Sequence, residues 1–118
     1  MAERIVSERP TGSTHLFTVR DEIAESEVEA VLVATENGPR AWLNYCRHRG
    51  ARLDTGEGAL RDGSIRCPRH GAVFDPESGD CESGPCAGKP LHGLDVERRE
   101  DGVYLTASGY SFVGEGGI

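Results

Sequence analysis

The chain has 118 residues, 36% hydrophobic and 28% charged, which is typical of one small domain with a single core. Sixteen glycines and six prolines exclude a simple helical bundle and favour a loop-rich, mostly β architecture. The net charge of −7 argues against a general nucleic-acid-binding protein. The longest apolar run, residues 30–34, is too short to cross a membrane, and the charged N-terminal sequence does not look like a signal peptide. We therefore expect a soluble, cytoplasmic protein.

The first part of the chain predicts strands joined by turns. Residues 15–20 alternate between apolar and polar side chains, and residues 28–35 are rich in β-branched side chains. Asn37-Gly38 is a tight-turn signal before residues 41–45, so the runs on either side of it should pair as a hairpin. The acidic segment 21–29 has too few apolar positions for a helical face and is expected to be a loop or a short turn.

The middle of the chain, residues 46–92, is interrupted every few positions by Gly, Pro, Asp or Ser. Short strands are expected only at residues 59–60, 64–67 and 72–74. A segment with so little regular structure should not hold its shape by packing alone, so we expect a metal site to hold it together.

The end of the chain predicts one closing hairpin. Residues 94–98 alternate, a turn follows at residues 100–102, and residues 103–107 return as a strand. The glycine-rich tail from Gly109 onward is expected to be frayed.

Two short motifs in the middle segment each offer one thiolate and one imidazole. The four candidate ligands are Cys46, His48, Cys67 and His70. They could form one tetrahedral zinc site or hold two metals. Because a glycine follows each motif, at Gly50 and Gly71, the backbone can turn sharply and approach inorganic sulfur closely, which suits a [2Fe–2S] cluster.

These residues resemble the Rieske-type iron–sulfur proteins, through C-R-H-R-G at residues 46–50 and C-P-R-H-G at residues 67–71. The likeness covers about residues 44–91 closely, and the flanking strands match it only in pattern. The resemblance implies an all-β fold, a β-sandwich-like stack of small antiparallel sheets with a loop-rich cluster-binding tip. It also implies one domain over residues 1–118, with a cluster-binding subdomain at about residues 44–91.

The same resemblance implies one [2Fe–2S] cluster and a role for each ligand. Cys46 and Cys67 would bind the inner iron, and His48 and His70 would bind the outer, solvent-facing iron through Nδ1. Pro85 would lie in a third loop that covers the cluster.

The chain departs from the respiratory members of that family at four positions. Ala51 and Arg69 stand where those proteins carry two cysteines, so their disulfide between the cluster loops cannot form here. Ala72 and Phe74 stand where a Ser and a Tyr donate hydrogen bonds to cluster sulfurs. With fewer such bonds, we expect a potential toward the low end of the Rieske range of about −150 to +300 mV.

Several residues outside the motifs have a less specific interpretation. Cys81 and Cys86 fit no plant-type ferredoxin spacing and are not expected to be ligands, and a cytoplasmic location disfavours a stable disulfide. His15 and His92 are expected to be ordinary surface residues. Trp42 is expected to pack in the core rather than relay electrons.

The resemblance implies a one-electron carrier, a soluble ferredoxin that passes electrons between a reductase and an oxygenase or other redox enzyme. We do not expect an enzyme, because a Rieske oxygenase needs a second iron site with two further histidines and a carboxylate, and the only histidines left are His15 and His92. The alternatives are a small Rieske subunit of a larger redox enzyme such as nitrite reductase, and a structural zinc-binding interaction module.

The positive charge of the chain is concentrated in the two motifs and in the segment that joins them. Residues 46–70 hold six arginines and three acidic residues, whereas the whole chain is acidic. The arginines form either a solvated rim or a docking face for an acidic redox partner. No nucleic-acid or membrane partner is expected. The six arginines of residues 46–70 are Arg47, Arg49, Arg52, Arg61, Arg66 and Arg69.

Overall fold

The computed structural model describes residues 3–6, 14–35, 37–45, 53, 60–61, 63–67, 71–84 and 90–116. Every regular element in these ranges is a strand, which confirms the expected all-β class. The described residues therefore include no helix that could span a membrane. The strands are β1 (Glu3–Val6), β2 (His15–Asp21), β3 (Ser26–Thr35), β4 (Gly38–Leu43), β5 (Leu60–Arg61), β6 (Ser64–Arg66), β7 (Val73–Phe74), β8 (Cys81–Ser83), β9 (Gly93–Leu94), β10 (Val96–Arg99), β11 (Gly102–Leu105) and β12 (Tyr110–Glu115).

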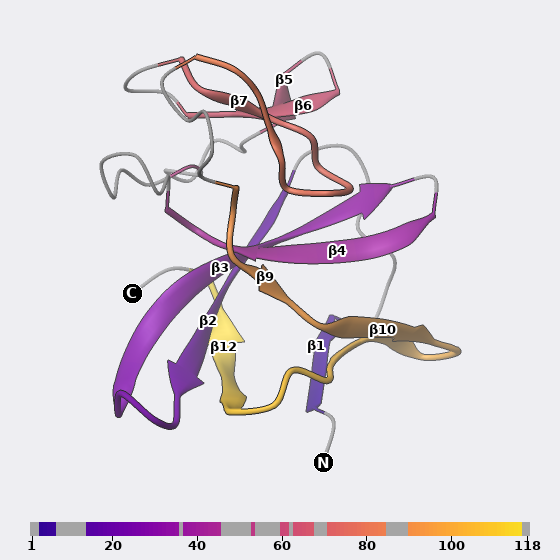
Figure 1. The fold of residues 1–118 in the computed structure, drawn as a ribbon. Helices are drawn as coiled ribbons and strands as arrows, with labels where there is room; N and C mark the ends of the chain where they lie inside the picture. Colours follow the sequence, from indigo (N-terminus) through magenta and orange to yellow (C-terminus); the bar gives the residue numbers. More distant parts are fainter. Residues whose placement is uncertain are drawn as a thin grey trace.

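The strands form three antiparallel sheets. The largest has the order β12-β2-β3-β4-β9, the second β1-β11-β10, and the third β5-β6-β7-β8. Figure 1 shows the β5–β8 sheet above the long β3–β4 hairpin, with β1 and β10 on the opposite side of that hairpin. The expected hairpin around Asn37-Gly38 is confirmed, because Thr35 pairs with Gly38 across the turn. Gly38 has a φ of 112°, a backbone conformation that favours glycine.

The central sheet is buried on both faces, because successive side chains of a strand point to opposite sides. On β3, Val31 and Val33 pack on one side while Ala30 and Leu32 pack on the other. On β4, Trp42 shares a core with Val31 and Val33. The sheet therefore separates two cores, which we call the first core, on the side of β5–β8, and the second core, on the side of β1, β10 and β11.

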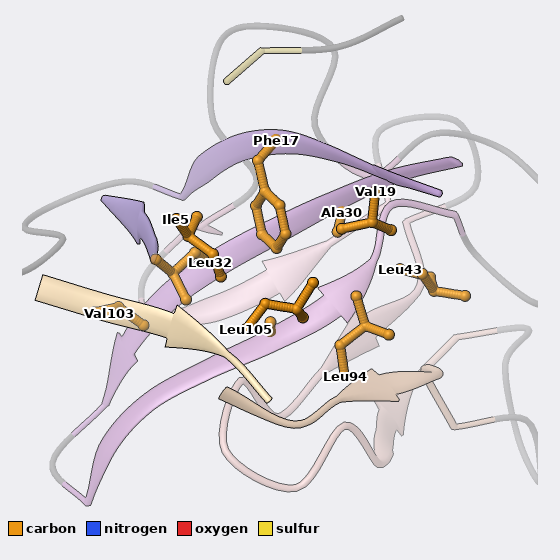
Figure 2. Close-up of a cluster of buried hydrophobic side chains, with 10 residues drawn as sticks. Ile5, Phe17, Val19, Ala30, Leu32, Leu43, Leu94, Val103 and Leu105 are labelled. Atoms are coloured by element: carbon orange, nitrogen blue, oxygen red, sulfur yellow. The ribbon is translucent and has the colours of Figure 1, made fainter. Parts of the chain in front are cut away.

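The second core is made of aliphatic and aromatic side chains from both the five-stranded sheet and the β1-β11-β10 sheet. Figure 2 shows Phe17 of β2, Leu94 of β9 and Leu105 of β11 pointing into this shared space. Its buried members are Ile5, Phe17, Val19, Ala30, Leu32, Ala41, Leu43, Leu94, Val103 and Leu105. Burial of these apolar side chains is the main force that holds the β1-β11-β10 sheet against the five-stranded sheet.

The first core joins the short strands to the central sheet. Its buried members are Val31, Val33, Trp42, Leu53, Ile65, Cys67, Ala72, Phe74 and Leu91. Trp42 is its largest side chain, and the indole Nε1 donates a hydrogen bond to the Pro76 carbonyl at 2.9 Å. A Cβ on Gly79 would lie 2.6 Å from the indole Cζ3, so the chain approaches Trp42 too closely for any other residue there. The expected core role of Trp42 is confirmed.

The acidic segment 21–29 is mostly strand, contrary to expectation. Only residues 22–25 form the turn, where the Asp21 carboxylate accepts the backbone N–H groups of Ile23 and Ala24 at 3.0 Å each. From Ser26 onward the chain pairs with β2, and Glu27 lies opposite Arg20. The outer part of a hairpin is stabilised by backbone pairing and by cross-strand side-chain pairs, and it does not need a continuous apolar face. The acidic composition of this segment was therefore not a reliable sign of a loop.

Residues 110–115 of the glycine-rich tail form β12, so the expectation of a frayed end from Gly109 is wrong for the described part of the tail, and residues 117–118 lie outside it. Phe112 lies 6.3 Å from Phe17 between ring centroids, and Tyr110 also packs against the second core. Two aromatic side chains thus hold the strand on β2, despite the glycines around them. The short strand β8 was also not expected, because its residues CES carry no strand pattern.

Substitution of Gly79 tests how closely the first core is packed. Gly79→Ala should lower the free energy of unfolding by about 3 kcal/mol, because a left-handed backbone with a φ of 78° gains a Cβ that collides with Trp42. Gly109→Ala is the matched control, since Gly109 has a φ of 84° but open space around the added Cβ. The control should cost only about 1 kcal/mol. Equal unfolding midpoints in urea for the two variants would contradict this account of the core.

Candidate metal centre

One of the four expected ligands lies in the part of the chain that the structure describes. Cys67 follows β6, its side chain is fully buried, and it is a free cysteine. Cys46, His48 and His70 lie outside the described residues, as does Pro85. Within the described ranges, no group of three or more His, Cys, Asp or Glu side chains could hold a metal ion. The ligand set as a whole therefore stays a prediction.

The loop that follows Cys67 is closed by its own backbone. The Cys67 N–H donates to the Ala72 carbonyl at 2.8 Å, and the Gly71 N–H donates to the Cys67 carbonyl at 3.0 Å. Gly71 has a φ of 71°, as expected for a glycine that lets the chain turn sharply. The two ends of segment 67–72 thus meet, and β7 continues directly from it.

A third segment packs against this loop. A Cβ on Gly84, at the end of β8, would lie 2.9 Å from the Ala72 Cα and 3.2 Å from the Gly71 carbonyl oxygen. The chain that leads to Pro85 therefore starts in direct contact with the loop that carries His70. Such close backbone contact leaves room only for a glycine.

The surroundings of Cys67 are apolar. Ile65, Ala72 and Phe74 are each fully buried in the same core. None of these three side chains can donate a hydrogen bond. A buried thiol in an apolar setting, at the start of a tight loop, suits a soft metal ion or an iron–sulfur cluster.

Sequence reasoning missed Asn44, which is 3% exposed and lies two residues before Cys46. Its side-chain Oδ1 accepts the backbone N–H of Leu53 at 3.1 Å. The signal in the sequence was a single amide among the apolar residues that end β4, directly before a ligand motif.

Cys81 differs from expectation. It is disulfide-bonded and half-buried against the first core, whereas a stable disulfide was disfavoured on the assumption of a cytoplasmic location. Because Cys67 is free, the second cysteine of this disulfide lies outside the described residues.

The two remaining histidines differ from each other. His92 is exposed as expected, and its ring lies 5.8 Å from that of Tyr45. His15 is half-buried, and its Nε2 is shielded with no hydrogen-bond partner among the described residues, so the expectation of an ordinary surface residue is wrong for it. His15 begins β2 and pairs with the buried Leu32 of β3.

The arginines between the motifs are only partly described. Arg66 is exposed on β6, and Arg61 belongs to β5 by its backbone. The side chains of the other members of the set lie outside the described residues, so their arrangement stays a prediction.

Comparisons with known proteins agree on one family. The family model of the Rieske [2Fe-2S] domain matches residues 10–102. Human apoptosis-inducing factor 3 (Homo sapiens) is 39% identical over 79 residues, which are 66% of this chain and 13% of that protein. The chain thus spans a small part of this curated relative.

Two solved structures share the fold. The ferredoxin of carbazole 1,9a-dioxygenase from Nocardioides aromaticivorans IC177 matches with a TM-score of 0.68 and 22% identity, over 91% of this chain and 98% of that chain. A chain of the complex of reduced oxygenase and oxidized ferredoxin in carbazole 1,9a-dioxygenase matches with a TM-score of 0.67 and 25% identity, over 88% and 100%. The expected stack of small antiparallel sheets is confirmed. The chain belongs to the Rieske family, and its domain binds one [2Fe-2S] cluster.

Proposed function

We propose that the protein is a one-electron carrier that passes electrons between a reductase and an oxygenase or another redox enzyme. The observation that carries this proposal is the extent of the structural match, which covers 98% of a dioxygenase ferredoxin. Such a ferredoxin carries electrons and has no catalytic site of its own. We further propose one domain over residues 1–118 with a cluster-binding subdomain at about residues 44–91.

The proposed ligands are Cys46 and Cys67 for the inner iron, and His48 and His70 for the outer iron. When bound, the cluster supplies a site that takes up and releases one electron. The chain's own contribution is visible at Cys67, whose thiol is withheld from water by the first core. The closed loop 67–72 limits where His70 can lie relative to Cys67.

Cys81 is consistent with this ligand set if its disulfide partner is Cys86. The other cysteine outside the described residues is Cys46, which cannot be a ligand and a disulfide partner at once. We also propose a cytoplasmic location. Stable disulfides are rare in the cytoplasm, so the disulfide of Cys81 argues against this location, and fractionation of the source cells tests it.

The purified protein should be red-brown, should contain two irons and two sulfides per chain, and should give a rhombic EPR signal after reduction with dithionite. Cys67→Ala should abolish the colour, because it removes a buried ligand, whereas His92→Gln should keep it, because His92 is exposed and is not a proposed ligand. Absorption spectra and metal analysis measure both.

Peptide mapping of the same protein checks the cysteines. After acid release of the cluster and alkylation without reductant, Cys46 and Cys67 should carry the label, and Cys81 and Cys86 should be linked. A Cys46–Cys81 link, or a colourless protein with one zinc per chain, would contradict the proposed site.

The potential should respond to hydrogen-bond donors introduced at Phe74. Phe74→Tyr adds a hydroxyl inside the first core, and a bond from it to a cluster sulfur would stabilise the reduced state and raise the potential. Val73→Thr is the matched control, since successive strand residues face opposite sides. Redox titration followed by absorption should show a rise for Phe74→Tyr alone. Equal potentials would mean that position 74 does not face the cluster.

We also propose that the arginine-rich segment docks an acidic redox partner. The exposed side chain of Arg66 and the excess of arginine over acid in residues 46–70 support it. Replacing both Arg47 and Arg69 by Gln should slow electron transfer to the partner severalfold at low salt and weaken its salt dependence. Arg98→Gln on β10 is the control, exposed in another sheet. Unchanged rates in stopped-flow measurements of the double variant would rule out this docking face.

A further inference from the structure

Asn44 is one of two buried polar side chains in the part of the chain that the structure describes, together with Thr18. It follows β4 at the point where the chain leaves the central sheet. Its backbone N–H donates to the Glu29 carbonyl on β3 at 2.9 Å, and the next N–H, that of Tyr45, folds back to the Leu43 carbonyl at 2.8 Å. The position of Asn44 is therefore set by the sheet.

The side chain of Asn44 holds a residue that is nine positions further along. Its Oδ1 accepts the Leu53 backbone N–H at 3.1 Å in a buried hydrogen bond. The Leu53 side chain is 1% exposed and belongs to the first core. Leu53 is thus fixed by its side chain in the core and by its backbone on Asn44. A buried hydrogen bond of this kind is costly to lose, because the N–H would be left without a partner.

The segment between these two anchors, residues 45–52, holds two of the proposed ligands, Cys46 and His48. The other cluster loop, residues 67–72, is short enough to be closed by backbone hydrogen bonds between Cys67, Gly71 and Ala72. The first loop is longer, and the described bond between its ends comes from the Asn44 side chain. The amide does for the first loop what backbone groups do for the second.

We propose that Asn44 is a positioning residue of the cluster site, whose side chain closes the first cluster loop and so fixes Cys46 and His48 relative to Cys67. The inference rests on the proposed ligand set. An amide suits this role because it accepts a hydrogen bond without bringing a negative charge into a site that becomes more negative on reduction. Aspartate would accept the same bond and add that charge.

Three variants of Asn44 separate the effect of the hydrogen-bond acceptor from the effects of side-chain polarity and charge. Asn44→Leu has a similar volume and removes the acceptor, and Asn44→Ser stays polar but is too short to reach Leu53. Asn44→Asp keeps an oxygen at the acceptor position. Thr18→Val is the matched control, because it also removes a side-chain hydrogen bond of a buried residue, from the Thr18 hydroxyl to the Gly116 carbonyl at 2.8 Å, on a different strand.

The rate of cluster loss to an iron chelator, followed by absorption, should rise about tenfold or more in Asn44→Leu and Asn44→Ser relative to Thr18→Val. The EPR signal of the remaining reduced cluster should broaden in the same two variants. Asn44→Asp should keep the wild-type line shape and slow cluster loss, with a lower potential. A general loss of stability would raise the rate in Thr18→Val equally and would leave the EPR line shape and the potential unchanged.

The proposal is overturned if Asn44→Ser and Asn44→Leu lose the cluster no faster than Thr18→Val and keep the wild-type EPR signal. If Asn44→Leu does not fold, Asn44→Ser alone decides the question. Failure of the proposed function looks different, because the wild-type protein itself would then contain no [2Fe–2S] cluster.

Discussion

The structure depends on the alternation of side chains along β3 and β4, which gives the central sheet two buried faces. Because neither face is exposed, each must be covered by another part of the chain. The β1-β11-β10 sheet covers one of them with ordinary strands. The other is covered by strands of only two or three residues, which cannot form a stable sheet alone. The β5–β8 sheet thus depends on contact with the central sheet, and Trp42 is the largest side chain in the core between them.

The short strands are supplemented by individual contacts between backbone and side chain. Trp42 holds the Pro76 carbonyl, Asn44 holds the Leu53 N–H, and Gly84 lies against Ala72. Each contact begins at the central sheet or at the loop after Cys67 and ends on an irregular segment. Such contacts restrict a loop without the long ladders of a regular sheet, and a bound metal cluster would add its own cross-links to them.

The sequence predicts the regular and the chemical features of this chain better than its contacts. The hairpin around Asn37-Gly38 and the central strands follow from local signals. The family follows from the two Cys/His motifs, and the ligand set itself stays a prediction. The order of β12 could not be foreseen, because it depends on Phe112 meeting Phe17, far away in the chain. The bond from Asn44 to Leu53 spans only nine residues, but predicting it requires knowing that both residues are buried. The glycine content correctly indicated a chain with many turns, but it did not show that Gly79 lies against Trp42 or Gly84 against Ala72.

Packing and redox properties have a common cause at the first core. Ile65, Ala72 and Phe74 are fully buried in the same core as Cys67, which is itself withheld from water. The same side chains offer no hydrogen-bond donors, and an apolar setting disfavours the added negative charge of a reduced cluster. Tight packing and the predicted low potential therefore have the same origin in these residues. A more polar core would raise the potential, but it would also have to satisfy every new polar group in a region held by few strands.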